Sequence, residues 1–412
     1  MSDRKRTIIV SGMIAADPGQ GGATWAVLQY VLGLRRLGHD VYFVEPLPAK
    51  SLRKSGRPSV GAVSGSGDPD TTPGSADTEL SASTLHDSIN AAYFRAVADQ
   101  YGLRDRASLL LAGTRETFGL PYDELVAVGR RADALVNISG MLTDEAILAA
   151  IPVRIYLDLD PAFNQLWHNQ GIEMRLAGHT HFVTIGQTIG QADCPIPTCG
   201  VSWIATNQPI VLEHWPACDT IDFDALTTVG NWRGYGSITH DGVFYGQKAH
   251  SLRPFMSLPR KTKEKFILAM GIHPDEVQDL KSLNENGWEL VDPIEVAGTP
   301  AAYQRFILES KAEFGIAKSG YVAARCGWFS DRSVCYLASG RPVIAQQTGF
   351  TRFLPAGEGL FAFESIDDVL AAIDAVRSDY KRHSRAARSL AAEFFDSDMV
   401  LSRLLRLTGV VS

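Results

Sequence analysis

The stretch of sequence that decides the fold runs Lys318-Ser-Gly-Tyr-Val-Ala-Ala-Arg-Cys-Gly-Trp-Phe-Ser-Asp-Arg-Ser-Val-Cys-Tyr-Leu-Ala-Ser-Gly-Arg-Pro-Val-Ile-Ala-Gln-Gln-Thr-Gly-Phe350. It predicts the end of a strand, a loop, a helix that begins near Asp331 or Arg332, a tight turn and a short buried strand. The first N–H groups of that helix lack intrahelical partners and carry the positive end of the helix dipole. Because ligands of open α/β sheets bind beyond the carboxyl ends of the strands, the stretch predicts an anion site above a sheet.

Two further segments, each at the start of a predicted domain, continue this α/β pattern with a strand and a glycine-containing loop. The first has an apolar strand at Thr7-Ile-Ile-Val10, a loop with several glycines, a helix from about residue 23 to 37 and a strand at Val41-Tyr-Phe-Val44. The second is Thr227-Thr-Val-Gly-Asn-Trp-Arg-Gly-Tyr-Gly236, a strand that runs into a glycine-rich loop. Both are typical of nucleotide-binding units, although Gly21-Gly22 in the first loop is not the usual dinucleotide fingerprint.

The chain is long enough for two domains, each with its own core. We predict an N-terminal Rossmann-like domain over residues 1–217, a C-terminal one over 218–395 and a C-terminal helix within 396–412. Between 46 and 83 the composition shifts to Ser, Gly, Pro, Asp and Thr, which predicts a long mobile loop. We favour a passive insertion over a substrate lid for this loop.

Composition excludes several classes of function. The 412 residues are 45% hydrophobic and 21% charged, with a net charge of −7, so no basic surface for nucleic acid is expected. The charged N-terminus and short apolar runs indicate neither a membrane span nor a signal, and predict a cytoplasmic protein. Five cysteines without framework spacing are consistent with reduced thiols, and no complete metal-binding set is present. Oligomerisation stays open.

Three motifs resemble the GT-B-fold glycosyltransferases. Gly38-His39-Asp-Val-Tyr-Phe-Val-Glu45 is similar to the "G-H-x-V" of their second strand, and Ala338-Ser-Gly-Arg-Pro-Val-Ile344 to their "A-x-G-x-P-V-I". Cys326-Gly-Trp-Phe-Ser330 is similar to their "H-C-G-W-N-S" core, and the full run resembles a poorly characterised bacterial group. The resemblance implies two Rossmann-like domains facing each other across a cleft, with C-terminal helices that pack back toward the N-terminal domain. It is sharp only over residues 311–363.

The same motifs depart from the family at four positions. Gly327 and Cys335 stand where a retaining branch carries its two glutamates, and Arg325 and Phe329 replace the histidine and asparagine of the other core. The resemblance therefore leaves the stereochemical outcome open. It implies a hexosyltransferase-like enzyme that transfers a sugar from a UDP-, GDP- or dTDP-sugar to a hydroxyl-bearing acceptor, which is a small molecule, a glycan or a nucleoside-like compound. It also implies that no metal or other cofactor is required.

Donor contacts are predicted on the C-terminal domain. Cationic and helix-terminal residues would bind the diphosphate: Arg233, Lys248, Lys318, Arg325, Ser330, Asp331 and Arg332. The resemblance implies that polar residues after the short strand bind the donor sugar: Gln347, Thr348 and Gly349. Gly21 and Gly22 would let the first loop approach donor and acceptor. A structural alternative makes Asp331 only a helix cap and Arg332 its surface partner.

The base that takes the acceptor proton is predicted on the N-terminal domain. Asp158 and Asp160 follow the strand Val153-Arg-Ile-Tyr-Leu157, and Asp17 lies in the first loop. Asp158 is preferred for its position at the strand end, and its structural alternative is a carboxylate that caps the next turn. Two other functions share this pattern: a nucleotide-sugar 2-epimerase, and a non-catalytic protein that binds nucleotides or glycans.

Overall fold

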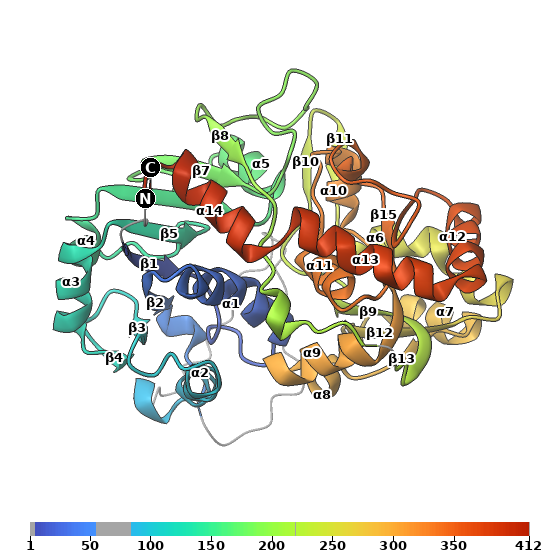
Figure 1. Cartoon of the computed structure of the whole chain (residues 1–412), viewed down its shortest axis with the longest axis horizontal. Coiled ribbons are helices and arrows are strands. Elements are labelled where there is room, and N and C mark those ends of the chain that lie inside the picture. Colours follow the sequence, from blue (N-terminus) through green and yellow to red (C-terminus); the bar gives the residue numbers. More distant parts are fainter. Residues whose placement is uncertain (1–4, 55–83, 219, 412) are drawn as a thin grey trace.

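The computed structural model describes residues 5–54, 84–218 and 220–411, and within them the chain forms two α/β domains side by side (Figure 1). The N-terminal domain contains one eight-stranded sheet in the order β4-β3-β2-β1-β5-β6-β7-β8. All neighbours in it are parallel except β3 and β4. Its strands are β1 (Thr7–Ser11), β2 (Asp40–Leu47), β3 (Ala107–Leu111), β4 (Thr117–Gly119), β5 (Ala134–Ile138), β6 (Val153–Asp158), β7 (His181–Thr184) and β8 (Trp203–Ala205).

The C-terminal domain contains a six-stranded parallel sheet in the order β13-β12-β9-β14-β15-β16. These strands are β9 (Phe223–Asn231), β12 (Lys265–Gly271), β13 (Glu289–Leu290), β14 (Ser310–Gly315), β15 (Val343–Gln346) and β16 (Leu360–Phe363). A separate antiparallel ribbon pairs β10 (Ile238–His240) with β11 (Val243–Tyr245). Both large sheets contain the Rossmann strand order, so the connections change direction between β1 and β5 and between β9 and β14.

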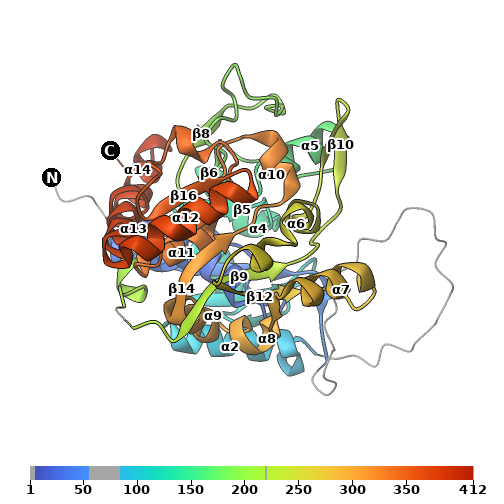
Figure 2. The same ribbon diagram turned by 90° about the vertical axis from the view of Figure 1, so that its right-hand side faces the viewer.

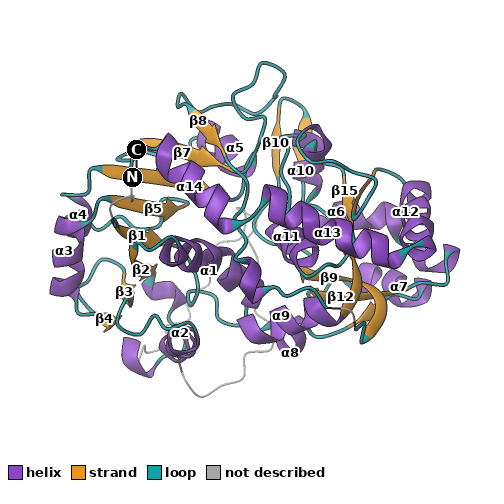
Figure 3. Ribbon diagram, in the orientation of Figure 1, coloured by secondary structure: helices purple, strands orange, loops and turns teal. Residues whose placement is uncertain are grey.

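Helices cover both sheets, as Figure 2 and Figure 3 show. The N-terminal domain has α1 (Gly21–Arg36), α2 (Ile89–Gln100), α3 (Tyr122–Arg131), α4 (Glu145–Leu148) and α5 (Phe163–Asn169). The C-terminal domain has α6 (Lys248–Leu252), α7 (Val277–Asn286), α8 (Pro293–Ala297), α9 (Pro300–Glu309), α10 (Ser319–Ala324), α11 (Asp331–Ala338), α12 (Ile366–Ser378) and α13 (Tyr380–Phe394). The last helix, α14 (Ser397–Leu407), packs against α1 and returns the chain to the N-terminal domain (Figure 1).

The two crossings between the domains lie next to each other. One runs from β8 to β9, and the other is the break between α13 and α14, where Asp396 caps α14 by accepting a hydrogen bond from Asp398 N at 2.8 Å. Ile210 N donates to Phe395 O at 2.7 Å, and Ser397 N donates to Ile210 O at 2.9 Å. The domains are therefore tied along one edge of their interface by main-chain hydrogen bonds.

Side chains also join the domains beside α1. Trp25 Nε1 donates to Pro300 O at 2.8 Å, and the Trp25 ring lies 5.0 Å from Trp215. A Cβ added to Gly21 would lie 2.3 Å from Thr299 O, and one added to Gly22 would lie 2.8 Å from the Tyr303 ring. The two glycines therefore permit close packing of α1 on the α8–α9 segment.

The α/β prediction of two Rossmann-like domains is confirmed, as is the return of the C-terminal helices. The helix predicted near Asp331 begins at that residue. The domain boundaries stay predictions, with the two large sheets inside 7–205 and 223–363.

Two local expectations need correction. The loop predicted over 46–83 begins later, because β2 continues through Leu47 and a 3-10 turn follows at Ala49–Ser51. Residues 55–83 of that loop lie outside the described residues. The loop expected around Gly327 to Ser330 does precede α11, but the helix α10 before it was not predicted, because its six residues are too few to show a helical period.

Candidate active site

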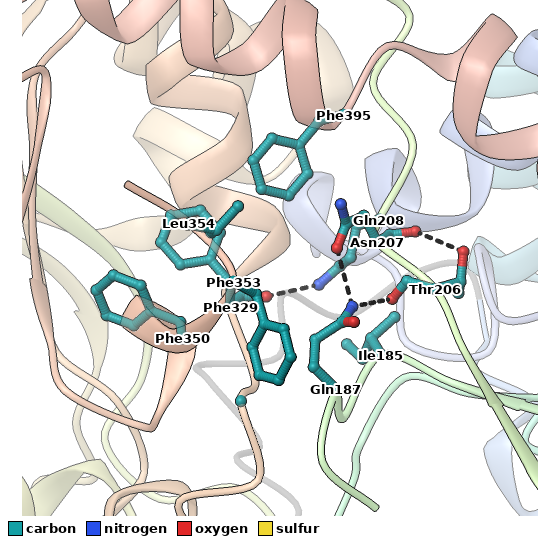
Figure 4. A pocket seen from close by; sticks show the side chains of 11 residues that line it. Ile185, Gln187, Thr206, Asn207, Gln208, Phe329, Phe350, Phe353, Leu354 and Phe395 are labelled. Carbon is teal, nitrogen blue, oxygen red and sulfur yellow. Dashed lines mark hydrogen bonds between the residues drawn. The ribbon is translucent and has the colours of Figure 1, made fainter. Parts of the chain in front are cut away.

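The carboxyl-terminal edges of the two sheets face each other across the domain interface. Thr188 N, beyond β7, donates to Cys326 O at 3.0 Å, and Gln208 Nε2, beyond β8, donates to Phe329 O at 3.0 Å. A pocket between them has an apolar wall of phenylalanines and leucine and an opposite wall rich in amides (Figure 4). It is lined by Ile185, Gln187, Thr206, Asn207, Gln208, Gly327, Phe329, Phe350, Phe353, Leu354 and Phe395.

Lys248 supplies an available positive charge at the C-terminal switch point. A Cβ added to Gly230, near the end of β9, would lie 2.7 Å from Lys248 Nζ, so the ammonium packs directly against this glycine. The side chain is half-buried and forms no ion pair among the described residues. Burial, followed by the charges of Arg332 and Lys318, lowers the pKa of Lys248 to about 7. A cation held away from water without a counter-ion suits an anionic ligand.

The N-terminus of α11 faces the same region. Ser330 is the N-cap, but its side chain makes no capping bond, and the first intrahelical bond runs from Val334 N to Ser330 O at 3.1 Å. The amides of Asp331, Arg332 and Ser333 therefore lie outside the helical ladder. Ser330 Oγ donates to Asp331 Oδ1 at 3.4 Å, and Asp331 is the first helical residue rather than the N-cap.

Arg332 turns inward instead of toward the cleft. Its Nε lies 2.5 Å from Glu313 Oε1, and Nη1 donates to Val229 O at 3.1 Å. Glu313 is fully buried, and its second carboxylate oxygen has no hydrogen-bond partner. The structure places Arg332 in a buried ion pair, so it is not a surface partner of Asp331, and its predicted contact with the diphosphate stays a prediction.

The loops before α11 and after β15 support each other. Gly327 N donates to Thr348 O at 2.9 Å, and the Thr348 hydroxyl donates to Trp328 O. Gly349 has φ of 92°, and a Cβ there would lie 2.5 Å from Arg325 O, so a glycine is required. Gln347 Oε1 accepts from Gly349 N at 2.9 Å, which fixes the predicted sugar-binding loop beside the helix terminus.

Two of the predicted phosphate ligands lie in ion pairs away from α11. Arg325 pairs with Glu364 at 2.8 Å, and both side chains are more than 60% exposed. Arg233 pairs with Glu276 beyond the end of β9. The structure thus brings Lys248, Lys318, Ser330 and Asp331 together and leaves the two arginines at the margins.

Asp158 organises the loop between β6 and α5. Its carboxylate is fully buried and accepts hydrogen bonds from Asp160 N (2.9 Å), Asn164 Nδ2 (2.7 Å), Gln165 Nε2 (2.7 Å) and Thr184 Oγ1 (2.8 Å). Burial raises the pKa of Asp158 to about 6, against these bonds. The buried carboxylate has the contacts of the structural alternative, a cap of the next turn, and the role of Asp158 as base stays a prediction.

Asp160 is the carboxylate that reaches the interface. Lys318 Nζ lies 3.2 Å from Asp160 Oδ2, and the Tyr321 hydroxyl donates to Oδ1. Burial raises the pKa of Asp160, and Lys318 opposes that rise. Ala162, two residues on, has φ of 73° and ψ of −53°, a strained conformation for alanine. The strained conformation of Ala162 and the hydrogen bonds to Asp158 together orient the Asp160 side chain toward the C-terminal domain.

The first loop follows β1 in the N-terminal domain. Asp17 pairs with Arg53 at 2.7 Å, with both side chains more than one-third exposed. Ala15 N and Ala16 N donate to the carboxylate of Glu45 at 2.9 and 2.6 Å, and burial raises the pKa of Glu45 to about 7. Gly21 and Gly22 start α1 and contact the α8–α9 segment, so the structure gives them a packing role.

Sequence reasoning missed three residues of the site. Glu313 and Tyr321 lie within apolar runs, where a polar side chain is the only local signal. Tyr235 lies in the glycine-rich loop after β9, and its ring centre is 3.7 Å from Lys318 Nζ. In the described residues no group of three or more His, Cys, Asp or Glu side chains could hold a metal ion.

Comparisons with known proteins agree with this geometry. No protein-family model matches the sequence, and no curated protein matches it. An alpha-glucosyltransferase in complex with UDP superposes with a TM-score of 0.58 at 10% identity, covering 98% of this chain and 100% of that one. Anabaena HepE in complex with UDP and glucose gives a TM-score of 0.55 at 11% identity, covering 98% and 99%. The chain has the GT-B glycosyltransferase fold.

A glycosyltransferase from Rickettsia africae also matches over almost the whole length, with a TM-score of 0.51, 12% identity and 98% coverage of each chain. At such identities the likeness of these GT-B proteins to this chain extends to the fold alone. Within the described residues no helix is long and apolar enough to cross a membrane.

Proposed function

We propose that the protein transfers a sugar from a nucleotide-diphosphate sugar to a hydroxyl-bearing acceptor. The observation that carries the proposal is the unpaired Lys248 ammonium at the end of β9, opposite Asp160 of the other domain. The same edge carries the open N-terminus of α11, and the combination suits a diphosphate. UDP bound to the GT-B proteins of similar fold supports a nucleotide as the ligand class.

The reaction assigns one task to each side of the interface. The bond between the sugar's anomeric carbon and the diphosphate oxygen breaks, and the leaving diphosphate gains negative charge. Lys248, Lys318 and the first amides of α11 stabilise that charge. Because these groups supply the compensating positive charge, we propose a reaction that requires no metal ion.

The acceptor oxygen forms the new bond to the anomeric carbon and loses its proton to Asp160. A general base must reach that proton within hydrogen-bond distance, and Asp160 presents its carboxylate at the interface while Asp158 does not. We propose that Gln347 and Gly349, in the loop held beside α11, contact the sugar.

A donor screen followed by product analysis tests the proposal. Thermal shift with UDP-, GDP- and dTDP-sugars should identify a stabilising donor, because a ligand that binds only the folded state raises its melting temperature. The stabilising donor is then incubated with and without a panel of hydroxyl acceptors. Transfer predicts free nucleoside diphosphate and a glycosylated acceptor. An altered sugar nucleotide without acceptor would indicate a 2-epimerase instead, and binding without consumption would indicate a non-catalytic protein.

A further inference from the structure

Lys318 joins the two catalytic sides of the interface. It is the N-cap residue of α10, and its Nζ lies 3.3 and 3.2 Å from the two carboxylate oxygens of Asp160. The ammonium also lies over the Tyr235 ring and donates to the Tyr235 hydroxyl. The exposed fractions of the two charged side chains are 17% and 21%, so this ion pair is largely shielded from water.

Other ion pairs between the domains are more exposed. Arg352 and Asp193, which also join the two sides, are 48% and 63% exposed, and pairs of that kind contribute little. The shielded Lys318–Asp160 pair therefore has more influence on how the interface behaves.

The contacts block the proposed base. Asp160 Oδ1 accepts from Lys318 and Tyr321, and Oδ2 accepts from Lys318. A carboxylate whose oxygens both face an ammonium is a poor proton acceptor, because the positive charge stabilises its ionised form. The structure thus shows Asp160 in place but held by Lys318.

The Lys318 ammonium also lies near the groups that we propose to bind the donor diphosphate. Lys318 is close enough to Lys248 and to Asp331 for their charges to act on one another. A diphosphate bound at Lys248 and the α11 N-terminus would carry about two negative charges, against one on Asp160. At comparable distances the ammonium is attracted more strongly to the diphosphate.

We propose that the donor diphosphate withdraws Lys318 from Asp160, so that the base becomes available only once the donor is bound. This inference rests on the proposed function. Lys318 is then a positioning residue that makes binding ordered, with the donor first. Tyr321 keeps its hydrogen bond to Asp160 after Lys318 leaves, which holds the carboxylate in its orientation.

Asp160 and the diphosphate compete for the Lys318 ammonium. This competition should change the affinity for the nucleotide even when no sugar is transferred. Removing the charge of Asp160 should release Lys318 and tighten nucleotide binding, even though Asp160 itself is not proposed to touch the nucleotide. A purely structural ion pair gives the opposite result, because its loss loosens the interface.

Calorimetry with UDP, and with GDP and dTDP if UDP does not bind, tests this. Asp160→Asn should bind the nucleotide roughly three- to tenfold more tightly than wild type, which lies within the coupling range of groups in one salt-bridge network. Lys318→Met should bind more weakly, and adding Asp160→Asn to it should have no further effect. Tyr321→Phe is the matched control: it removes the other bond to Asp160 and should give no tightening.

The outcomes distinguish the release of Asp160 by the donor from the proposed function. If wild type binds a nucleoside diphosphate but Asp160→Asn binds it equally or more weakly, the release of Asp160 by the donor is refuted while the proposed function stands. If no nucleoside diphosphate binds wild type, both are refuted. Melting temperatures of the variants identify any that fail to fold, and Lys318→Arg, which keeps the charge, should then retain wild-type nucleotide binding.

Discussion

Lys248→Met removes the unpaired ammonium and keeps most of the volume of the side chain. Because a hydrogen bond to a charged group contributes about 1.5–3 kcal/mol, the variant should bind UDP-glucose roughly 10- to 150-fold more weakly at pH 6. The pH dependence of the affinity gives a second quantitative prediction. The Lys248 pKa of about 7 in the free protein means that binding through the ammonium weakens above that pH, by roughly tenfold between pH 6 and pH 8.

The assay is calorimetry with UDP-glucose at several pH values. The diphosphate of UDP-glucose is esterified at both ends and lacks the phosphate proton that titrates near pH 6 in a monoester. Wild type should lose affinity as the pH rises through 7, whereas Lys248→Met should be weak and nearly independent of pH. Lys248→Arg is the control, because arginine stays charged throughout. An equal pH slope in wild type and Lys248→Met would refute the reasoning.

The folding stability of wild type should rise with pH, whereas its affinity for UDP-glucose falls. The folded state lowers the Lys248 pKa from its ordinary value of 10.5, so between pH 7 and 10.5 the unfolded chain binds more protons than the folded one. The buried ammonium therefore costs folding free energy at or below pH 7, and this cost disappears as the pH rises toward 10.5. Lys248→Met should be more stable than wild type at pH 7 in a urea titration.

Three further predictions concern the supporting structure. Asp158→Asn cannot accept all four hydrogen bonds and should lose about 2–4 kcal/mol of stability, measured by thermal unfolding; an unchanged melting temperature would contradict its role as the hub. Arg332→Met leaves Glu313 buried without a partner and should cost about 3–5 kcal/mol in urea unfolding, most of which a second change, Glu313→Gln, should restore. Gly21→Ala places a methyl group 2.3 Å from Thr299 O and should lower stability by about 1–3 kcal/mol, whereas Gly234→Ala, whose new Cβ would lie 3.7 Å from Gln247 Oε1 in ordinary contact, avoids that clash.

The sequence predicts the fold because the signals that specify it are local. Apolar strands such as Thr7–Ser11 and Val343–Gln346 are short, buried and followed by glycine or polar loops, which is the pattern of parallel strands. The start of α11 at Asp331 was predictable for the same reason. Short helices such as α10 and edge strands such as β4 were not, since too few residues carry a period.

The site was predictable only as a set of residue types at strand ends. Asp158 and Asp160 are two residues apart, and only the fold shows that one is a buried hub and the other faces Lys318. Arg332 and Lys248 are both cations near one switch point, but a buried glutamate from β14 occupies Arg332 and leaves Lys248 free of ion pairs within the described residues. Contacts between segments far apart in the sequence decide these roles, and no local pattern encodes them.

The most direct test of glycosyl transfer across the domain interface compares wild type with Asp160→Asn. Both are incubated with the donor that stabilises the fold and with the acceptor panel, and the released nucleoside diphosphate and the glycosylated product are measured. We predict that wild type forms both products and that Asp160→Asn forms neither at a comparable rate, although it still binds the donor. Product formation by Asp160→Asn at the wild-type rate would contradict the account.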